Sequence, residues 1–137
     1  MADMQPIQMT WTGGMKFEGG KVGGPSFVLD GDAAVAPSPV DALVAAVAAC
    51  SGIDVVAILE KMQQPLKALV VHARATRADE YPKRLTKMHL TYEATGTGLD
   101  LAKVRRAAEL STTKYCSVMQ SLAKDTDVEW DVTLVEG

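Results

Sequence analysis

The stretch VDALVAAVAACSGIDVVAILEKM, residues 40–62, decides the fold of this chain. It contains no proline, and Pro65 follows shortly after it. Ser38 is a favoured N-cap residue, and Pro39 suits the first helical position. These signals predict a helix within residues 37–62, of about 24 residues and about 36 Å in length.

This expected helix is apolar on nearly every face between Val40 and Val56. The polar exceptions are Asp41, Ser51 and Asp54. A helix that is apolar all round is normally buried on all sides. In a chain of 137 residues this predicts a central helix, covered in part by a second subunit. Gly52 costs up to about 1 kcal/mol relative to alanine within a helix, so we expect it to pack closely against a neighbouring element.

Apolar and polar residues alternate on both sides of the helix, which is the pattern of half-buried strands. Residues 7–17 and 27–29 alternate around Gly13-Gly14 and predict a three-stranded meander. Residues 69–76 and 87–94 alternate again and are joined by a short polar turn. The second pair of runs therefore predicts a β-hairpin with a loop of about four to seven residues.

Two short helices and a final strand are expected in the last third of the chain. Asp100 is a suitable N-cap for a helix whose apolar stripe is Leu101, Val104 and Ala108. A second helix is expected from Thr112 or Thr113, and residues 128–134 alternate as a strand. The order βββ-α-ββ-αα-β predicts an α+β fold. The length predicts one domain over residues 1–137.

Composition limits the class of protein. Hydrophobic residues make up 47% and aromatic residues only 5%, so the core must consist mainly of Ala, Val, Leu and Met. The formal net charge of −3 argues against a nucleic-acid binder. No secretory signal is apparent, and the longest uninterrupted apolar run, Ala42–Ala49, is shorter than the roughly 20 residues that span a bilayer. We expect a cytoplasmic protein without nucleic-acid or membrane partners.

Cys50 lies near the middle of the apolar helix, where a cysteine often serves only as a small core residue. The start of the helix is about 11 residues away, or about 16 Å, and the effect of the helix dipole fades within the first turn. A reactive Cys50 would therefore need a cation from elsewhere in the fold to lower its pKa.

Cys116 follows the Ser111–Thr113 segment and is expected in or near the first turn of the second short helix. Unpaired backbone N–H groups and the helix dipole favour a thiolate there, and Lys114 adds positive charge. We therefore expect Cys116 to be the easier of the two thiols to ionise. The alternative is a core residue beside Tyr115 and Met119.

No metal or cofactor site is expected from the sequence. The two cysteines are far apart in the chain and form no CxxC motif, and no histidine lies at ligand spacing. His72 and His89 fall on the polar faces of their strands and are interpreted as ordinary histidines. The paired glycines precede no helix, so they form no phosphate-binding loop.

Two motifs carry a family resemblance. The run APSPVDALVAAVAACSGIDVVAILEKM, residues 36–62, resembles the central-helix signature of OsmC-like proteins. The run STTKYCSVMQSL, residues 111–122, resembles their second-cysteine helix. The chain resembles a small, poorly characterised branch of the OsmC/Ohr family. The resemblance implies an intertwined homodimer in which two sheets wrap the central helices and the sites lie at the subunit interface.

The characterised branches reduce organic hydroperoxides with two cysteines in oxidative-stress defence. The resemblance implies that Cys50 attacks the O–O bond and becomes a sulfenic acid, with which Cys116 condenses to a disulfide. A dithiol, lipoyl groups in the characterised branches, then restores both thiols by exchange. The implied substrate is a small apolar hydroperoxide.

The peroxidase branches orient the attacking cysteine with an arginine from the N-terminal strands and a glutamate near the start of the central helix. Here no arginine precedes Arg74, and Lys16 and Lys21 are the only basic residues among the first 60. A lysine cannot supply the bidentate fork of an arginine. Asp41 is the candidate for the catalytic carboxylate, with Val40 beside it; its alternative role is to complement the helix dipole.

These departures keep two other hypotheses open. The first is a non-peroxidatic OsmC-like protein that binds a hydrophobic small molecule or senses redox state. The second is a structural interaction module, in which both thiols would have ordinary pKa values near about 8.5.

Overall fold

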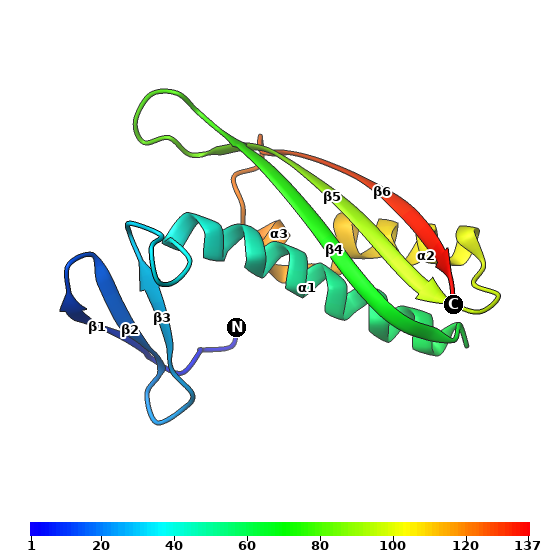
Figure 1. Ribbon diagram of the computed structural model, residues 1–137, viewed down its shortest axis with the longest axis horizontal. Coiled ribbons are helices and arrows are strands. Elements are labelled where there is room, and N and C mark those ends of the chain that lie inside the picture. Colours follow the sequence, from blue (N-terminus) through cyan, green and yellow to red (C-terminus); the bar gives the residue numbers. More distant parts are fainter. The chain divides into compact units, whose positions relative to one another are not determined.

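The computed structural model describes residues 1–137. The chain divides into two compact units, Met1–Leu43 and Val44–Gly137, which are described separately. The order of elements confirms the predicted α+β sequence βββ-α-ββ-αα-β, with one π-helical segment added (Figure 1). The prediction of a single domain over the whole chain stays a prediction.

The N-terminal unit contains the expected meander. Strands β1 (Ile7–Gly13), β2 (Lys16–Lys21) and β3 (Phe27–Asp30) form one antiparallel sheet in this order. After β3, the buried carboxylate of Asp30 accepts hydrogen bonds from the backbone N–H groups of Asp32, Ala34 and Val35. These hydrogen bonds hold the pKa of Asp30 below its usual range, and the bond from Asp32 has the largest effect.

Helix α1 (Pro39–Lys61) begins where the sequence predicts. The Ser38 hydroxyl accepts the N–H of Asp41 at 3.1 Å, and the Asp41 carboxylate accepts the N–H of Ser38 at 3.4 Å. This reciprocal pair satisfies two N–H groups at the helix start in the manner of a capping box. Ser38 is therefore confirmed as the cap of the central helix.

The C-terminal unit is built on a second sheet, in the order β4 (Leu66–Arg77), β5 (Leu85–Gly96), β6 (Asp127–Glu136). β4 and β5 pair antiparallel as the predicted hairpin, joined by residues 78–84. β6 pairs parallel to β5. Parallel neighbours need a crossover connection, and residues 97–126, with their helices, provide it.

The crossover differs in detail from the prediction. α2 (Leu101–Leu110) is capped by Asp100, whose Oδ1 accepts the N–H of Ala102 at 2.9 Å, as expected. The second helix does not begin at Thr112 or Thr113. A π-helical segment, η1 (Ser111–Tyr115), follows α2 directly, and a single α-helical turn, α3 (Ser117–Gln120), comes after it.

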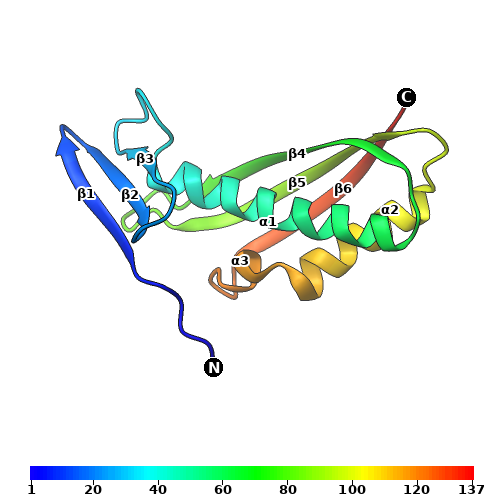
Figure 2. The same ribbon diagram turned by 90° about the horizontal axis from the view of Figure 1, so that it is seen from below.

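Helices α1 and α2 lie on the same face of the β4–β6 sheet (Figure 2). On β5, every second side chain faces them, and these four are fully buried: Met88, Leu90, Tyr92 and Ala94. From α1, Val47, Val55 and Leu59 complete the centre of this core, with Val104 and Ala108 from α2. The expected central helix is thus confirmed as a core element of the C-terminal unit.

By length and composition alone, α1 could also cross a membrane, since its most apolar window has a mean hydropathy of 2.3. The helix as a whole is therefore long and apolar enough to span a bilayer, although its longest uninterrupted apolar run is too short. The core helix of a soluble protein has the same composition. Because α1 packs against the sheet through fully buried Val47, Val55 and Leu59, we describe it as a core helix.

Gly52 marks the closest approach of α1 to β4. A Cβ atom at this position would lie 3.3 Å from Cγ2 of Val71 and 3.9 Å from Cδ2 of Leu69. The expectation that Gly52 packs closely against a neighbour is confirmed. The helix gives up the propensity of a larger residue here because the space between helix and strand is already filled.

We predict that Gly52→Val lowers the free energy of unfolding by about 1–3 kcal/mol, because overpacking forces α1 and β4 apart. Urea unfolding followed by circular dichroism measures the change. The matched control is Ala102→Val at an exposed position of α2, where only a propensity cost of about half a kcal/mol is expected. Equal losses in the two variants would contradict the tight contact at Gly52.

Candidate functional site

The structure brings the two cysteines together from distant parts of the chain. Cys50 lies on α1 and is partly exposed, whereas Cys116, between η1 and α3, is fully buried. The Cys50 side chain lies close enough to the Cys116 thiol to help raise its pKa. Both are free thiols. The pair that the sequence singled out is therefore one local site inside the C-terminal unit.

Cys116 is held on both sides. Its sulfur accepts the backbone N–H of Met119 at 3.4 Å and donates to the carbonyl of Val47 on α1 at 3.9 Å. Its own N–H donates to the carbonyl of Ser111 at 2.9 Å, which closes the π-helical turn. The thiol thus connects the crossover segment to the turn of α1 that precedes Cys50.

Burial raises the pKa of Cys116 to about 11, and the N–H of Met119 only partly offsets it. The side chain of Cys50 and the carboxylate of Asp54 contribute to the same rise. The expectation that its local sequence favours a thiolate at Cys116 is therefore wrong. The α3 helix has a single turn, and Lys114 lies over the Tyr115 ring, 5.1 Å from its centroid.

Asp41, the third predicted site residue, lies in the first turn of α1. It precedes Cys50 by nine residues, about two and a half helical turns. Its carboxylate accepts the N–H of Ser38 and completes the helix cap. This geometry is what a first-turn capping residue requires, and a catalytic role for Asp41 stays a prediction.

A chain of buried hydroxyl groups beside the cysteines was not predicted. Ser51 Oγ lies 2.5 Å from the Tyr92 hydroxyl and 2.7 Å from Ser111 Oγ, and Ser111 donates to Asp54 Oδ2 at 2.9 Å. Ser51, Tyr92 and Ser111 are all fully buried. Burial raises the pKa of Tyr92 to about 12, with the charges of Cys116 and Asp54 adding to it.

The sequence contained part of the signal for this chain. Ser51 and Asp54 are polar positions within an otherwise apolar stretch of α1. A polar group in a core needs a hydrogen-bonding partner, so these two positions called for partners elsewhere. The sequence did not indicate Tyr92 and Ser111 as these partners, because a tyrosine in a strand and a serine after a helix are common.

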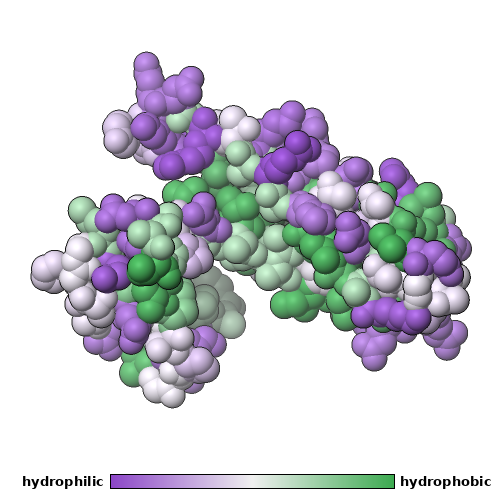
Figure 3. All heavy atoms as spheres, viewed as in Figure 1, coloured by the Kyte–Doolittle hydropathy of each residue, from purple (hydrophilic) through white to green (hydrophobic).

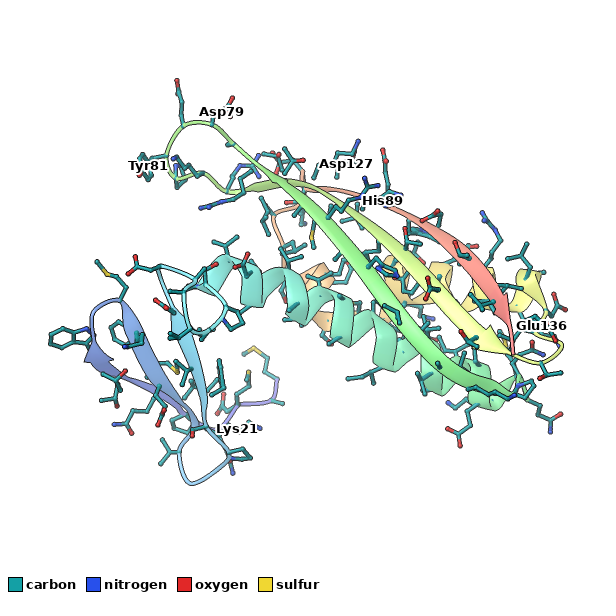
Figure 4. The ribbon with its side chains drawn as sticks, viewed as in Figure 1. Lys21, Asp79, Tyr81, His89, Asp127 and Glu136 are labelled. Carbon is teal, nitrogen blue, oxygen red and sulfur yellow. The ribbon has the colours of Figure 1, made fainter.

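The histidines lie away from the thiols, on the face of the sheet opposite α1 and α2. His72 pairs with Glu93 at 3.5 Å and His89 with Asp131 at 3.6 Å, both across neighbouring strands. Figure 4 shows His89 on β5. No group of three or more His, Cys, Asp or Glu side chains is arranged to hold a metal ion.

The family model described as "OsmC-like protein" matches residues 30–131. The chain belongs to the OsmC-like family. The match covers α1 with Cys50, the hairpin, and the crossover with Cys116. The family resemblance found in the two cysteine motifs is thereby confirmed.

This OsmC-like chain is similar to known relatives along most of its length. It is 36% identical to Protein YhfA of Escherichia coli (strain K12) over 122 residues, 88% of this chain and 91% of the relative. An OsmC-like protein from Mycoplasma pneumoniae has the same fold, with a TM-score of 0.83, 15% identity, and 98% and 99% of the two chains covered.

The organic hydroperoxide resistance protein OhrB of Bacillus subtilis is also similar in structure. Its TM-score is 0.65 at 15% identity, with 93% of this chain and 98% of OhrB covered. At this identity the likeness shows the shared fold.

We predict that Cys116 in a folded Cys50→Ser variant titrates at a higher pH than in the unfolded variant, because burial and Asp54 still raise its pKa after Cys50 is gone. The measurement is the rate of alkylation by iodoacetamide as a function of pH. The pH at the midpoint of this rate profile reports the pKa, because burial slows alkylation at every pH alike. The urea-unfolded variant should titrate near about 8.5, and the same midpoint in the folded protein would refute the raised pKa.

Proposed function

We propose that this OsmC-like protein reduces organic or lipid hydroperoxides, with Cys50 as the attacking thiol and Cys116 as the resolving thiol. The supporting observation is the contact of a partly exposed Cys50 with a fully buried Cys116. A peroxide can meet Cys50 first. The buried thiol is protected from the peroxide and is already adjacent to the sulfur that becomes oxidised.

The proposed cycle has three balanced steps. The Cys50 thiolate attacks the O–O bond and, with one proton for the leaving alkoxide, gives the sulfenic acid and the alcohol. The Cys116 thiol then attacks the Cys50 sulfur, and the displaced hydroxide leaves with the thiol proton as water. A dithiol of the lipoyl type restores both thiols by exchange and is oxidised to its own disulfide.

The raised pKa of Cys116 suits the resolving role. A neutral, buried thiol does not compete for peroxide. It attacks as it gives up its proton, which the departing hydroxide takes up to form water. The attacking thiolate of Cys50 requires a positive charge nearby. Asp54, the carboxylate that acts on Cys116, is not a source of such a charge.

We also propose that the working form is a homodimer in the cytoplasm. The outer side of α1 leaves Ile53 and Val56 exposed, with Ile53 at 69%. Figure 3 shows hydrophobic residues gathered over α1 and on the N-terminal sheet. Exposed apolar residues gathered in this way mark an association site, and the family resemblance implies a second copy as the partner.

The N-terminal unit supports the same proposal. Its 43 residues bury only Gly20 and Asp30. Its strands expose large apolar side chains: Ile7, Trp11, Phe17 and Phe27. A unit of this size without a core cannot be stable alone, so these side chains need a further apolar surface to cover them.

A second candidate function is binding of a hydrophobic small molecule, with the thiols as redox sensors. The observation behind it is a half-open pocket of about 340 Å³ beside α3, lined by apolar Met119, Leu122, Ala123 and Val128 and by polar Thr112, Gln120, Lys124 and Thr126. This volume lies in the range of small-molecule sites. The high pKa of Cys116 is also compatible with a thiol that reacts slowly.

We predict that equimolar cumene hydroperoxide consumes both thiols of the reduced protein and forms one internal disulfide. Cys116→Ser should stop at the sulfenic acid, which dimedone labels, and Cys50→Ser should consume no peroxide. Free-thiol titration and intact mass follow all three proteins. Unchanged thiols in the wild type, or equal consumption by Cys50→Ser, would reject the peroxidase and leave the sensing function.

We predict a dimer by light scattering at micromolar concentration. Ile53→Glu should shift the protein toward monomers, because it places a charge in an apolar interface where no partner compensates it. The matched control is Lys103→Glu, at an exposed position of α2, which should remain dimeric. A monomeric wild type would refute the dimer.

A further inference from the structure

The hydroxyl chain between Tyr92 and Asp54 has a defined direction. Each hydroxyl has one proton to donate, and Ser111 gives its proton to Asp54 Oδ2. Ser111 must therefore accept from Ser51, at 2.7 Å. Ser51 has then used its own proton and must accept from Tyr92, at 2.5 Å.

This direction of donation excludes a role for the chain as a proton donor to a substrate and is compatible with a role in positioning. The phenolic proton of Tyr92 is committed to Ser51, so Tyr92 does not serve as the acid that protonates a leaving alkoxide. The central hydrogen bond, between Ser51 and Ser111, joins residues 60 positions apart. The chain is thus better suited to fixing positions than to delivering protons to a substrate.

The two serines are each tied to one cysteine. Ser51 follows Cys50 directly in α1. The carbonyl of Ser111 accepts the N–H of Cys116 at 2.9 Å, which closes the π-helical turn that carries the second thiol. One side-chain hydrogen bond therefore connects the α1 turn of Cys50 with the η1 turn of Cys116. Single π-helical turns are frequent at functional sites for this kind of local placement.

We propose that Ser51 and Ser111 are positioning residues that set the register of Cys50 against Cys116, with Asp54 as the acceptor that orients the Ser111 hydroxyl. This inference rests on the proposed two-thiol function but concerns disulfide closure, not the attack on peroxide. Two thiols react efficiently only when they are held in the right geometry, and a misplacement of about 1 Å can cost about a hundredfold.

The test is the equilibrium between the internal disulfide and glutathione, which measures the effective concentration of one thiol at the other. No peroxide is involved. Ser51→Ala, which cuts the link between the two cysteine turns, should lower the effective concentration tenfold or more. Ser111→Ala removes the same hydrogen bond from the other side, should give the same loss, and replaces Ser51→Ala if that variant does not fold.

Tyr92→Phe is the matched control. It also removes a buried hydroxyl from the chain and costs stability, but it leaves the hydrogen bond between Ser51 and Ser111 in place. Its effective concentration should stay within about twofold of wild type. Asp54→Asn keeps an oxygen that accepts from Ser111 and should likewise retain the value, which a general loss of packing would not explain.

An unchanged effective concentration in folded Ser51→Ala or Ser111→Ala would overturn the proposal, as would an equal loss in Tyr92→Phe. Failure of the wild type to form the disulfide with glutathione would overturn it too. A wild type that forms this disulfide yet ignores hydroperoxides would reject the peroxidase function and leave the positioning role intact.

Discussion

Most of the C-terminal unit depends on the close packing of one face of α1 against the β4–β6 sheet. Val47, Ser51, Val55 and Leu59 follow one another at a spacing of four, and all are fully buried. Gly52 lets the helix pack against β4, where a Cβ atom would lie only 3.3 Å from Cγ2 of Val71. The same stripe thus forms the hydrophobic core and carries Ser51, the polar residue beside Cys50.

A polar residue in such a stripe is acceptable only when its hydrogen bonds are satisfied, because an unpaired buried hydroxyl costs about 1–3 kcal/mol. Ser51 is satisfied from two directions, by Tyr92 on β5 and Ser111 on η1. The chain ends at Asp54, which is partly exposed and so needs no further buried partner. A fully satisfied buried network also favours a single arrangement of the elements it joins. The cysteine pair lies beside this rigid part of the molecule.

Periodicity predicted the strands and the central helix because both patterns are local in sequence. The alternation along β5 and the cap formed by Ser38 and Asp41 needed nothing from distant residues. The π-helical turn at Ser111–Tyr115 could not be predicted, since it forms where the crossover meets Ser51 and Asp54 of α1. The motifs identified both cysteines as a pair, but the ease of ionisation of Cys116 depended on burial, which its local sequence did not reveal.

The charges and hydrogen bonds around Cys116 keep its thiol protonated. Every hydrogen bond and charge that the C-terminal unit directs at Cys116, except the N–H of Met119, favours the protonated thiol. The C-terminal unit therefore holds Cys50 and Cys116 next to each other, as a disulfide requires, but it disfavours the thiolate form of Cys116. A positive charge that activates Cys50 would have to act without also ionising its neighbour. Asp54, held in place by Ser111, helps to keep Cys116 protonated beside Cys50.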